Sequence, residues 1–301
     1  MRAVIALGGN ALLRRGEAPD IDTQSHNVAA AARVIAPIAR SHEVVVTHGN
    51  GPQIGLLALQ AAAYTPAKAY PLDVLGSESE GLIGYLLELA FANALPDRKI
   101  VALLTQVEVD PADPAFAAPT KPIGPVYGET EASRIAAEKG WPMMRDGTGW
   151  RRAVPSPLPQ RICELHAIRT LLDTGFVVIC AGGGGIPTVA PQSGERRGVE
   201  AVIDKDFAAA LLAESVGADF LLLLTDVPAV WTQWPMHDGA PIGKTTPGEL
   251  RRHSFAPGSM APKVEAACRF VERTGRPAGI GAIEQAVAIL QADAGTIVRS
   301  A

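Results

Sequence analysis

Glycine-rich turns follow strand-like apolar runs at three places in this sequence, and they are the feature best suited to chemistry. The turn residues are Gly8, Gly9 and Asn10 after Val4–Leu7; Gly49, Asn50 and Gly51 after Val44–His48; and Gly182, Gly183 and Gly184 after Val177–Ala181. A glycine turn after a parallel strand presents backbone N–H groups to an anion, and the next helix adds the positive end of its dipole. Glycine also ends strands for conformational reasons alone. Three such turns nevertheless predict a site that holds several phosphate-like or carboxylate-like groups.

Lysine is scarce in the chain, and three of the seven lysines have unusual sequence neighbours. Lys121 lies in a Pro-Thr-Lys-Pro segment, Lys205 is flanked by Asp204 and Asp206, and Lys263 follows a Gly-Ser-Met-Ala-Pro entry to a helix. Phosphoryl transfer depends on positive charge and aligned donors rather than on covalent help from the protein. We therefore interpret these lysines as candidates for neutralising phosphates, with an ordinary surface lysine as the alternative at each position.

The carboxylates near these lysines have two interpretations. Asp204 and Asp206 could orient the lysines or bind Mg²⁺, or they could cap the helix that starts there. The segment Thr225-Asp226-Val227 ends an apolar run, at the kind of strand end where open α/β sheets bind ligands, with a loop cap as the alternative. His48 is assigned no catalytic role, because an acceptor that is already anionic needs no general base.

Two further glycine patterns resemble nucleotide-binding motifs but lack their context. The segment 239–245 has three residues between its glycines where a P-loop has four, and it follows a polar loop instead of a strand. The segment 49–55 resembles a dinucleotide fingerprint, but no strand ending in an acidic residue follows about 20 residues later. We expect neither segment to act as its motif suggests.

The composition is typical of a globular protein of a reducing compartment. Hydrophobic residues make up 48% of the 301 positions, and the net charge of −4 comes without a dense Lys/Arg run, which argues against a nucleic-acid partner. No apolar run approaches the roughly 20 residues that span a bilayer, and no signal-peptide pattern opens the chain. The cysteines Cys163, Cys180 and Cys268 lack CxxC spacing, and the histidines show no metal-ligand spacing. We therefore expect a cytoplasmic protein with reduced thiols, no membrane partner and no metal held by its side chains.

Strand-like and helix-like patterns alternate along the chain. Strands are expected at 3–7, 43–47, 100–105, 176–181, 219–225 and 278–281, and helices at 27–40, from 52, at 78–94 with Ser77 or Ser79 as cap, at 205–216 and at 260–274. This alternation predicts an α/β fold in which helices cover both faces of a largely parallel sheet.

The stretch from Pro111 to Pro159 breaks the alternation. Prolines recur through it and cannot lie in central strands, while a structureless loop of about 50 residues is uncommon in a compact domain. We therefore predict a small subdomain at 111–159, with its own hairpin and a helix at 130–139, projecting from a single domain that covers 1–301. Because Lys121 and the Arg151-Arg152 pair lie in it, we expect this subdomain to act as a lid.

Several segments together form a more specific pattern. They are Ala6–Leu12, Thr47–Gln53, Pro71–Val74, Asp113–Phe116, Pro119–Pro125, Gly149–Pro157, Gly182–Pro187, Gly198–Asp206, Leu224–Val227 and Gly258–Met260. In these segments, and in their order, the chain resembles the carbamate kinases of the amino acid kinase family. The Thr-Lys-Pro and Gly-Trp-Arg-Arg sequences distinguish carbamate kinases from relatives that act on acetylglutamate, glutamate or UMP.

The resemblance implies a three-layer αβα sandwich with a largely parallel sheet of about eight strands, a protruding subdomain and a homodimer. It implies that the first two glycine turns hold the carbamate end and the transferring phosphate. Superfamily relatives carry a lysine just before the first glycine pair, where this chain has Ala6-Leu7. The resemblance assigns the missing charge to Lys121. It makes Lys205 and Lys263 the lysines that neutralise nucleotide phosphates and Asp206 the carboxylate that organises them. The nucleotide half would contain Asp204, Thr225, Asp226, Val227 and Met260.

The chain departs from the family pattern at two places. Ala261 replaces the usual glycine before the Pro-Lys of the third lysine segment, and a positive φ there would cost on the order of 1 kcal/mol and shift Lys263. The segment Leu75–Glu80 replaces the usual Ala-Met-Ser-Gln and adds Glu78 and Glu80. Two more carboxylates near an anionic substrate would alter its affinity.

The reaction implied by the resemblance is reversible phosphoryl transfer between ATP and carbamate, giving ADP and carbamoyl phosphate. Mg²⁺ would bridge the nucleotide phosphates, without a site built from side chains. One alternative is a phosphotransferase of the same family acting on another small carboxylate or phosphonate. Another is a regulator that binds nucleotide without turnover. The direction of the reaction and the branch of nitrogen metabolism, such as arginine catabolism, stay open.

Overall fold

The structure is a computed structural model of the 301-residue chain. It describes residues 1–9, 12–13, 17–18, 20–64, 69–190, 194–232, 239–256 and 258–301. Asn10, the last residue of the first predicted glycine turn, lies outside the described residues.

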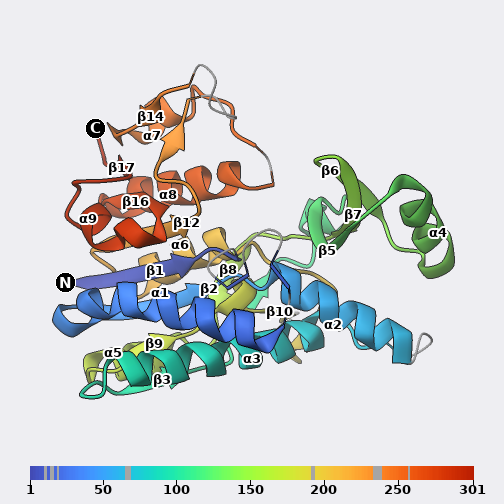
Figure 1. Ribbon diagram of the computed structural model, residues 1–301, viewed down its shortest axis with the longest axis horizontal. Helices are drawn as coiled ribbons and strands as arrows, with labels where there is room; N and C mark the ends of the chain where they lie inside the picture. The colour runs from blue at the N-terminus through green and yellow to red at the C-terminus, as the bar shows by residue number, and fades with distance from the viewer. Residues whose placement is uncertain are drawn as a thin grey trace.

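A single large sheet forms the centre of the molecule (Figure 1). In the part of the chain described, its eight strands follow the order β15 (Lys244–Thr245), β17 (Thr296–Val298), β16 (Ala278–Ala282), β12 (Phe220–Thr225), β1 (Arg2–Leu7), β2 (Glu43–His48), β9 (Val177–Ile179) and β3 (Ile100–Ala102). Neighbouring strands pair in parallel except at β16–β17. The predicted largely parallel sheet of about eight strands is confirmed.

Helices cover both faces of this sheet. Successive strand residues point to opposite faces, so Ile5 and Leu7 pack in one core while Val4 and Ala6 pack in the other. The first core lies against α1 (Ile21–Ser41), α3 (Leu72–Ala94) and α9 (Ala286–Leu290); the second lies against α5 (Leu165–Asp173), α6 (Lys205–Ser215) and α8 (Met260–Thr274). The two helical layers and the sheet make the predicted three-layer αβα sandwich.

Helix α3 begins earlier than predicted. The sequence suggested a start near Glu78 with Ser77 or Ser79 as cap, but the helix starts at Leu72 and its N-cap residue is Pro71. Proline has no side chain that can cap, so the first-turn N–H of Leu72 donates instead to Glu200 Oε2 at 2.7 Å. The prediction was wrong because the capping group comes from a distant part of the chain.

A smaller unit of three antiparallel strands and one helix stands away from the sandwich, beside α2 (Gly51–Tyr64) (Figure 1). Its strands pair in the order β5 (Lys121–Tyr127), β7 (Gly149–Val154) and β6 (Met143–Asp146), and α4 (Glu129–Lys139) packs on them. The unit contacts α2 backbone to backbone, since a Cβ atom on Gly55 would lie 2.0 Å from Gly124 Cα. Two glycines therefore set the close approach of β5 to the main body.

Short strands complete the fold. A second sheet has the order β11 (Arg197–Gly198), β10 (Ile186–Val189), β4 (Gln106–Val109) and β8 (Pro159–Ile162), and β13 (Val230–Trp231) pairs with β14 (Pro241–Ile242). The P-loop-like segment forms β14 and the edge strand β15, followed by the short helix α7 (Pro247–Leu250). It is not a strand–loop–helix unit.

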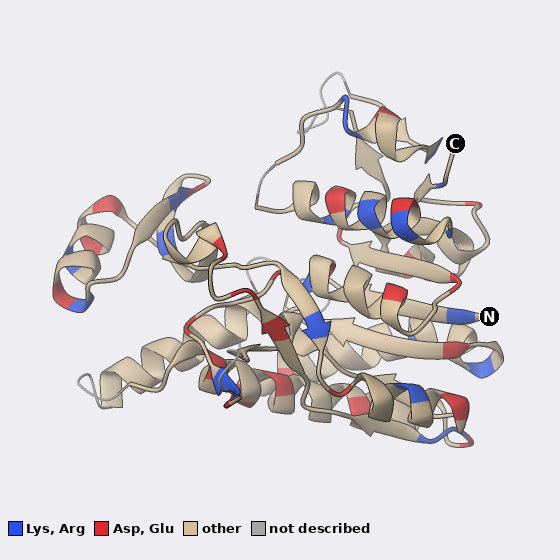
Figure 2. Cartoon of the chain, turned by 180° about the vertical axis from the view of Figure 1, so that it is seen from behind, with Lys and Arg blue, Asp and Glu red and all other residues tan. Residues whose placement is uncertain are grey.

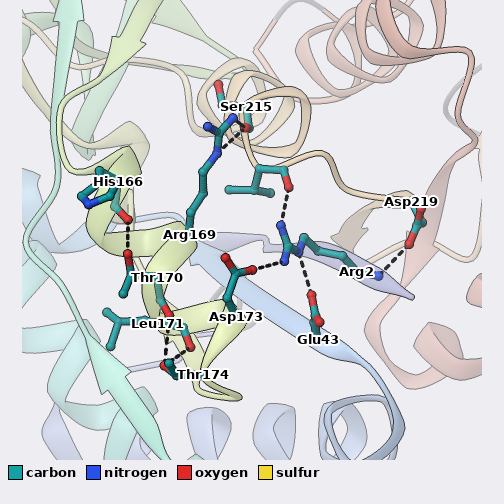
Figure 3. Close-up of polar contacts among 11 residues, drawn as sticks. Arg2, Glu43, His166, Arg169, Thr170, Leu171, Asp173, Thr174, Ser215 and Asp219 are labelled. Atoms are coloured by element: carbon teal, nitrogen blue, oxygen red, sulfur yellow. Dashed lines mark hydrogen bonds and ion pairs between the residues drawn. The ribbon is translucent and has the colours of Figure 1, made fainter.

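Arg2 ties several elements together at the end of the sheet where the parallel strands begin (Figure 3). Its guanidinium donates to Glu43 and Asp173, each at 2.8 Å, and to the carbonyl of Val216 at 2.7 Å. Its backbone N–H donates to Asp219 Oδ2 at 2.8 Å. These bonds join the starts of β1 and β2 to the ends of α5 and α6, opposite the glycine turns that follow the same strands.

Charged residues of both signs are interspersed over the outer helices (Figure 2). Within the described residues no helix is long and apolar enough to cross a bilayer.

Candidate functional site

The first two glycine turns lie side by side at the carboxyl ends of β1 and β2. Leu7 pairs with His48 in the sheet, and the N–H of Gly49 donates to the carbonyl of Leu7 at 3.0 Å. A Cβ atom on Gly49 would lie 3.1 Å from the backbone nitrogen of Gly9. A Cβ atom on Gly8 would lie 3.1 Å from the carbonyl oxygen at the end of β12. Glycine at both positions therefore lets three strand ends approach one another closely, and a larger residue would have to displace backbone by a few tenths of an ångström.

The third turn packs against the second. A Cβ atom on Gly183 would lie 2.1 Å from Asn50 Nδ2, and one on Gly182 would lie 2.2 Å from His48 Nε2. The Asn50 amide is fixed in turn by donating to Ser79 Oγ of α3 at 2.8 Å. All the glycines predicted for the site thus lie in one region, with Gly51 at the start of α2.

Three lysines from distant parts of the chain meet at this region through two aspartates. Lys121 Nζ lies 2.7 Å from Asp204 Oδ2. Lys205 Nζ lies 2.6 Å from Asp206 Oδ1, and Lys263 Nζ lies 3.0 Å from Asp206 Oδ2. The Lys205 side chain also borders the second turn, since a Cβ atom on Gly49 would lie 3.3 Å from Lys205 Cδ. The structure therefore brings together the lysines that the sequence singled out.

Helix starts place two of these lysines. Asp204 is the N-cap residue of α6 and accepts the backbone N–H of Asp206 at 2.9 Å, so Lys205 is the first residue of the helix. Lys263 lies in the first turn of α8, which packs beside α6. The positive ends of both helix dipoles therefore add to the lysine charges. Lys121 reaches the site from the first residue of β5.

Shared ion pairs set the electrostatics of the site. Burial alone would raise the pKa of Asp206, but Lys205 and Lys263 hold it well below its usual range. Burial lowers the pKa of Lys205 against the pull of Asp206, whereas Asp206 outweighs burial at Lys263 and raises its pKa. With Asp206 ionised, the two ammonium groups share one negative charge. Two ammonium groups that share one carboxylate at this point suit an anionic ligand.

The residues predicted for the nucleotide half lie around the lysines. Thr225 ends β12 next to Gly8 and donates to Asp226 Oδ1 at 3.1 Å. The negative charge of Asp226 helps to raise the pKa of Lys263. Val227 follows in the loop, half-buried, and Met260 is the first residue of α8. Asp226 thus acts on Lys263, while Thr225 and Val227 lie at the end of β12 and Met260 at the start of α8.

The departures from the family pattern have different consequences from those expected. Ala261 lies in the first turn of α8 and is absent from the positive-φ residues among the described ones, so the predicted strain beside Lys263 does not arise. Glu78 points to solvent from α3, while Glu80 is 3% exposed and lies beneath the third turn.

Sequence reasoning missed the residues that hold the third turn in place. Thr47 Oγ1 donates to the carbonyl of Ala181 at 2.8 Å, and the N–H of Ala181 donates to Thr105 Oγ1 at 2.9 Å. Glu80 accepts the N–H of Gly182 at 2.8 Å. The sequence carries two signals for these restraints. Polar residues, Thr47 and Thr105, stand at the ends of apolar runs, and a charged residue, Glu80, interrupts the apolar periodicity of α3.

Comparison with known proteins agrees with this geometry. The model of the amino acid kinase family matches residues 1–281. Carbamate kinase from Rhizobium meliloti (strain 1021) is 56% identical over 303 residues, covering 100% of this chain and 94% of the relative. Carbamate kinase from Haemophilus influenzae is 52% identical over 297 residues, covering 98% and 96%. The solved structure of carbamate kinase from Giardia lamblia bound to AMP-PNP superposes with a TM-score of 0.90 at 41% identity, covering 100% of this chain and 98% of that one. The chain belongs to the amino acid kinase family and, within it, to the carbamate kinases.

Proposed function

We propose that this chain catalyses reversible phosphoryl transfer between ATP and carbamate, with ADP and carbamoyl phosphate as the other pair. The observation that carries the proposal is the meeting of Lys121, Lys205 and Lys263 beside three amide-lined glycine turns. The relatives named carbamate kinase, and the AMP-PNP bound to one of them, support it.

The groups of the site suit transfer between two anions. The backbone N–H groups of the first two turns would hold the carbamate and the transferring phosphate. Lys205 and Lys263 would neutralise the nucleotide phosphates, where removal of one preorganised positive group typically costs a few kcal/mol of transition-state stabilisation. Asp204, Thr225, Asp226, Val227 and Met260 would line the nucleotide half, and the third turn would complete the anion-binding surface.

His48 has no part in this mechanism. Burial lowers its pKa to about 4, with the positive charge of Lys205 adding to the effect, so the ring is neutral at physiological pH. Its Nδ1 lies 3.1 Å from the carbonyl oxygen of Gly49, which can only accept, so Nδ1 carries the hydrogen. The imidazole supports the second turn, and carbamate needs no general base.

Mg²⁺ fits this site as an ion held mainly by nucleotide phosphates. Both oxygens of Asp206 face lysines, and those of Asp204 face Lys121 and a backbone N–H. No group of three or more His, Cys, Asp or Glu side chains suited to a metal occurs among the residues described. Mg²⁺ commonly combines few protein ligands with substrate phosphates, whose charge it neutralises.

We further propose that segment 111–159 is a lid inserted in the single domain 1–301. Lys121 connects this segment to the site, because it is the lysine of the three that the projecting unit contributes. Asp204 holds Lys121 Nζ at 2.7 Å, and an incoming phosphate would compete for the same ammonium group. Closure of the unit would then bring Lys121 to the transferring phosphoryl group.

A homodimer in the cytoplasm completes the proposal. Leu82, Tyr85 and Leu89 lie on one face of α3, at spacings of three and four residues, and are 37%, 60% and 49% exposed. Leu104 beside them is 55% exposed. Such an apolar face suits a second copy of the chain. The three free cysteines suit a reducing compartment.

The decisive experiment is formation of ATP from carbamoyl phosphate and ADP, run in both directions, with Lys121→Ala and Lys139→Ala. Lys139 lies exposed on α4 of the same projecting unit and is the matched control. We expect K121A to lose about 10²–10³ in kcat and K139A to keep full turnover. A folded K121A enzyme with full turnover would refute the role of Lys121.

The same assay separates the alternatives. Turnover with another small carboxylate or phosphonate, but not with carbamate, would indicate a different acceptor. Tight ADP binding without any turnover would indicate a regulator.

A further inference from the structure

The carboxyl group of Glu80 lies buried beneath the third glycine turn, and the proposed mechanism does not use it. Its Oε1 accepts the N–H of Gly182 at 2.8 Å, and its Oε2 accepts the N–H of Thr105 at 3.2 Å. The residue is 3% exposed. A buried carboxyl group with both oxygens bonded to backbone amides connects three separate elements: helix α3, the end of the β3 segment and the turn after β9.

The turn that Glu80 contacts has an unusual backbone. Ala181 has a φ of 51°, and Gly183, Gly184 and Gly185 follow with φ values of 67°, 101° and 84°. Left-handed backbone is costly for alanine and persists only where its surroundings hold it. Ala181 is fully buried and is held by Thr47 and Thr105 on its two sides. Glu80 accepts the N–H of the next residue, Gly182, so the hydrogen bonds that fix Ala181 are extended to the first glycine of the turn.

The surroundings of Glu80 favour the protonated form of its carboxyl group more than water does. Burial raises its pKa to about 8, against the backbone hydrogen bonds from Thr105 and Gly182, and the negative charge of Glu164 adds to the rise. A cavity of about 170 Å³ beside it is also lined by His48 of β2, Cys180 after β9, and Tyr85 and Glu88 of α3. His48 is neutral here, and burial raises the pKa of the Cys180 thiol. Glu80 therefore restrains the turn while burial reduces the negative charge that it places behind an anion site.

We propose that Glu80 is the positioning residue of the 181–185 turn. The N–H groups of Ala181, Gly182, Gly184 and Gly185 donate within the protein, so the N–H that Glu80 aims, through its bond to Gly182, at the oxygens of the phosphoryl or carbamate group is that of Gly183. The substrate side of this inference rests on the proposed function. Glu80 acts through Gly182, whose N–H it accepts at 2.8 Å.

The test replaces Glu80 by Met, which has similar bulk and no oxygen acceptor, and by Gln, which keeps one oxygen. The matched control is Glu78→Gln, on the same helix but facing solvent. Two quantities are measured on the full-length protein: hydrogen–deuterium exchange of peptides covering Gly182 and Thr105, and the KM values for carbamoyl phosphate and ADP.

We expect E80M to exchange faster in both peptides, E80Q to fall between E80M and the parent, and E78Q to match the parent. We also expect E80M to raise the KM for carbamoyl phosphate by about tenfold, which corresponds to about 1.4 kcal/mol, with little change in the KM for ADP. A folded E80M with parental exchange would overturn the proposal, and so would a raised KM without faster exchange.

Failure of the proposed function gives a different result. A parent protein that does not turn over carbamoyl phosphate would refute the activity. The exchange measurement would still decide whether Glu80 positions the turn.

Discussion

Asp206 accepts hydrogen bonds from both Lys205 and Lys263 while its side chain stays 4% exposed. Replacement by Asn would leave two buried ammonium groups without their shared counter-charge. We expect D206N to lower the free energy of unfolding by about 3–5 kcal/mol, since removal of one partner leaves uncompensated buried charge. It should also lower activity, because the lysines lose their alignment.

Urea denaturation with activity assays checks this expectation. Asp173→Asn is the control, because Asp173 pairs with Arg2 while being 66% exposed, and its loss should cost at most about 1 kcal/mol. Equal stability losses in the two variants would contradict a special role for Asp206.

Titration of Glu80 makes the free energy of unfolding fall as the pH rises. Its pKa rises from 4.5 to about 8 on folding, so the folded chain binds the proton more tightly than the unfolded chain. Its contribution to stability is therefore complete below about pH 4.5 and is lost as the pH rises through about 8. E80Q cannot titrate at this position. Between pH 5 and pH 9 the parent should therefore lose more free energy of unfolding than E80Q does. Denaturation curves at both pH values measure this, and an unchanged difference would sink the argument.

At the level of the elements, the contact between α2 and β5 controls the position of Lys121. A Cβ atom on Gly55 would lie 2.0 Å from Gly124 Cα and 2.4 Å from Gly124 N, so G55A must push β5 outward. We expect a loss of about 10²-fold in kcat, the size typical of misplacement by about 1 Å.

Gly76→Ala is the control for this change, because Gly76 also lies in a helix but has no atom near an added Cβ. We expect G76A to leave kcat unchanged and to gain up to about 1 kcal/mol of stability. Steady-state kinetics and thermal unfolding of the two variants provide the comparison. Full activity in G55A would show that β5 can shift without consequence for Lys121.

The elements also show where prediction from sequence succeeded. The glycine turns, the strands that precede them and the three lysines all carry local signals, because strand-ending glycines and charged helix starts are encoded within a few residues. The start of α3 at Leu72 was missed, since its capping oxygen belongs to Glu200. The restraints on Ala181 and Gly182 were missed for the same reason: Thr47, Thr105 and Glu80 lie far from them in sequence and meet them only through the tertiary fold.

For the whole molecule, the exposed face of α3 predicts self-association. Tyr85 lies in the middle of the Leu82–Leu89 face, whereas Tyr64, 92% exposed, lies at the end of α2. Placing a charge inside an apolar interface carries a large desolvation cost. We expect Tyr85→Arg to shift the protein from dimer to monomer and Tyr64→Arg to leave it dimeric. Sedimentation velocity measures the mass, and a parent that sediments as a monomer would rule out the proposed dimer.

The bond between Arg2 and Asp219 has a consequence for biosynthesis, because it spans 217 residues. Strand β1 pairs with β12 on one side, so a nascent chain on the ribosome carries β1 with that edge unsatisfied until residues 220–225 emerge. At roughly 5–20 residues per second, this interval lasts on the order of ten seconds or more. Pairing of β1 with β12 is therefore a late event in synthesis, and until then β1 presents an edge of unpaired backbone N–H and C=O groups that can pair with another chain.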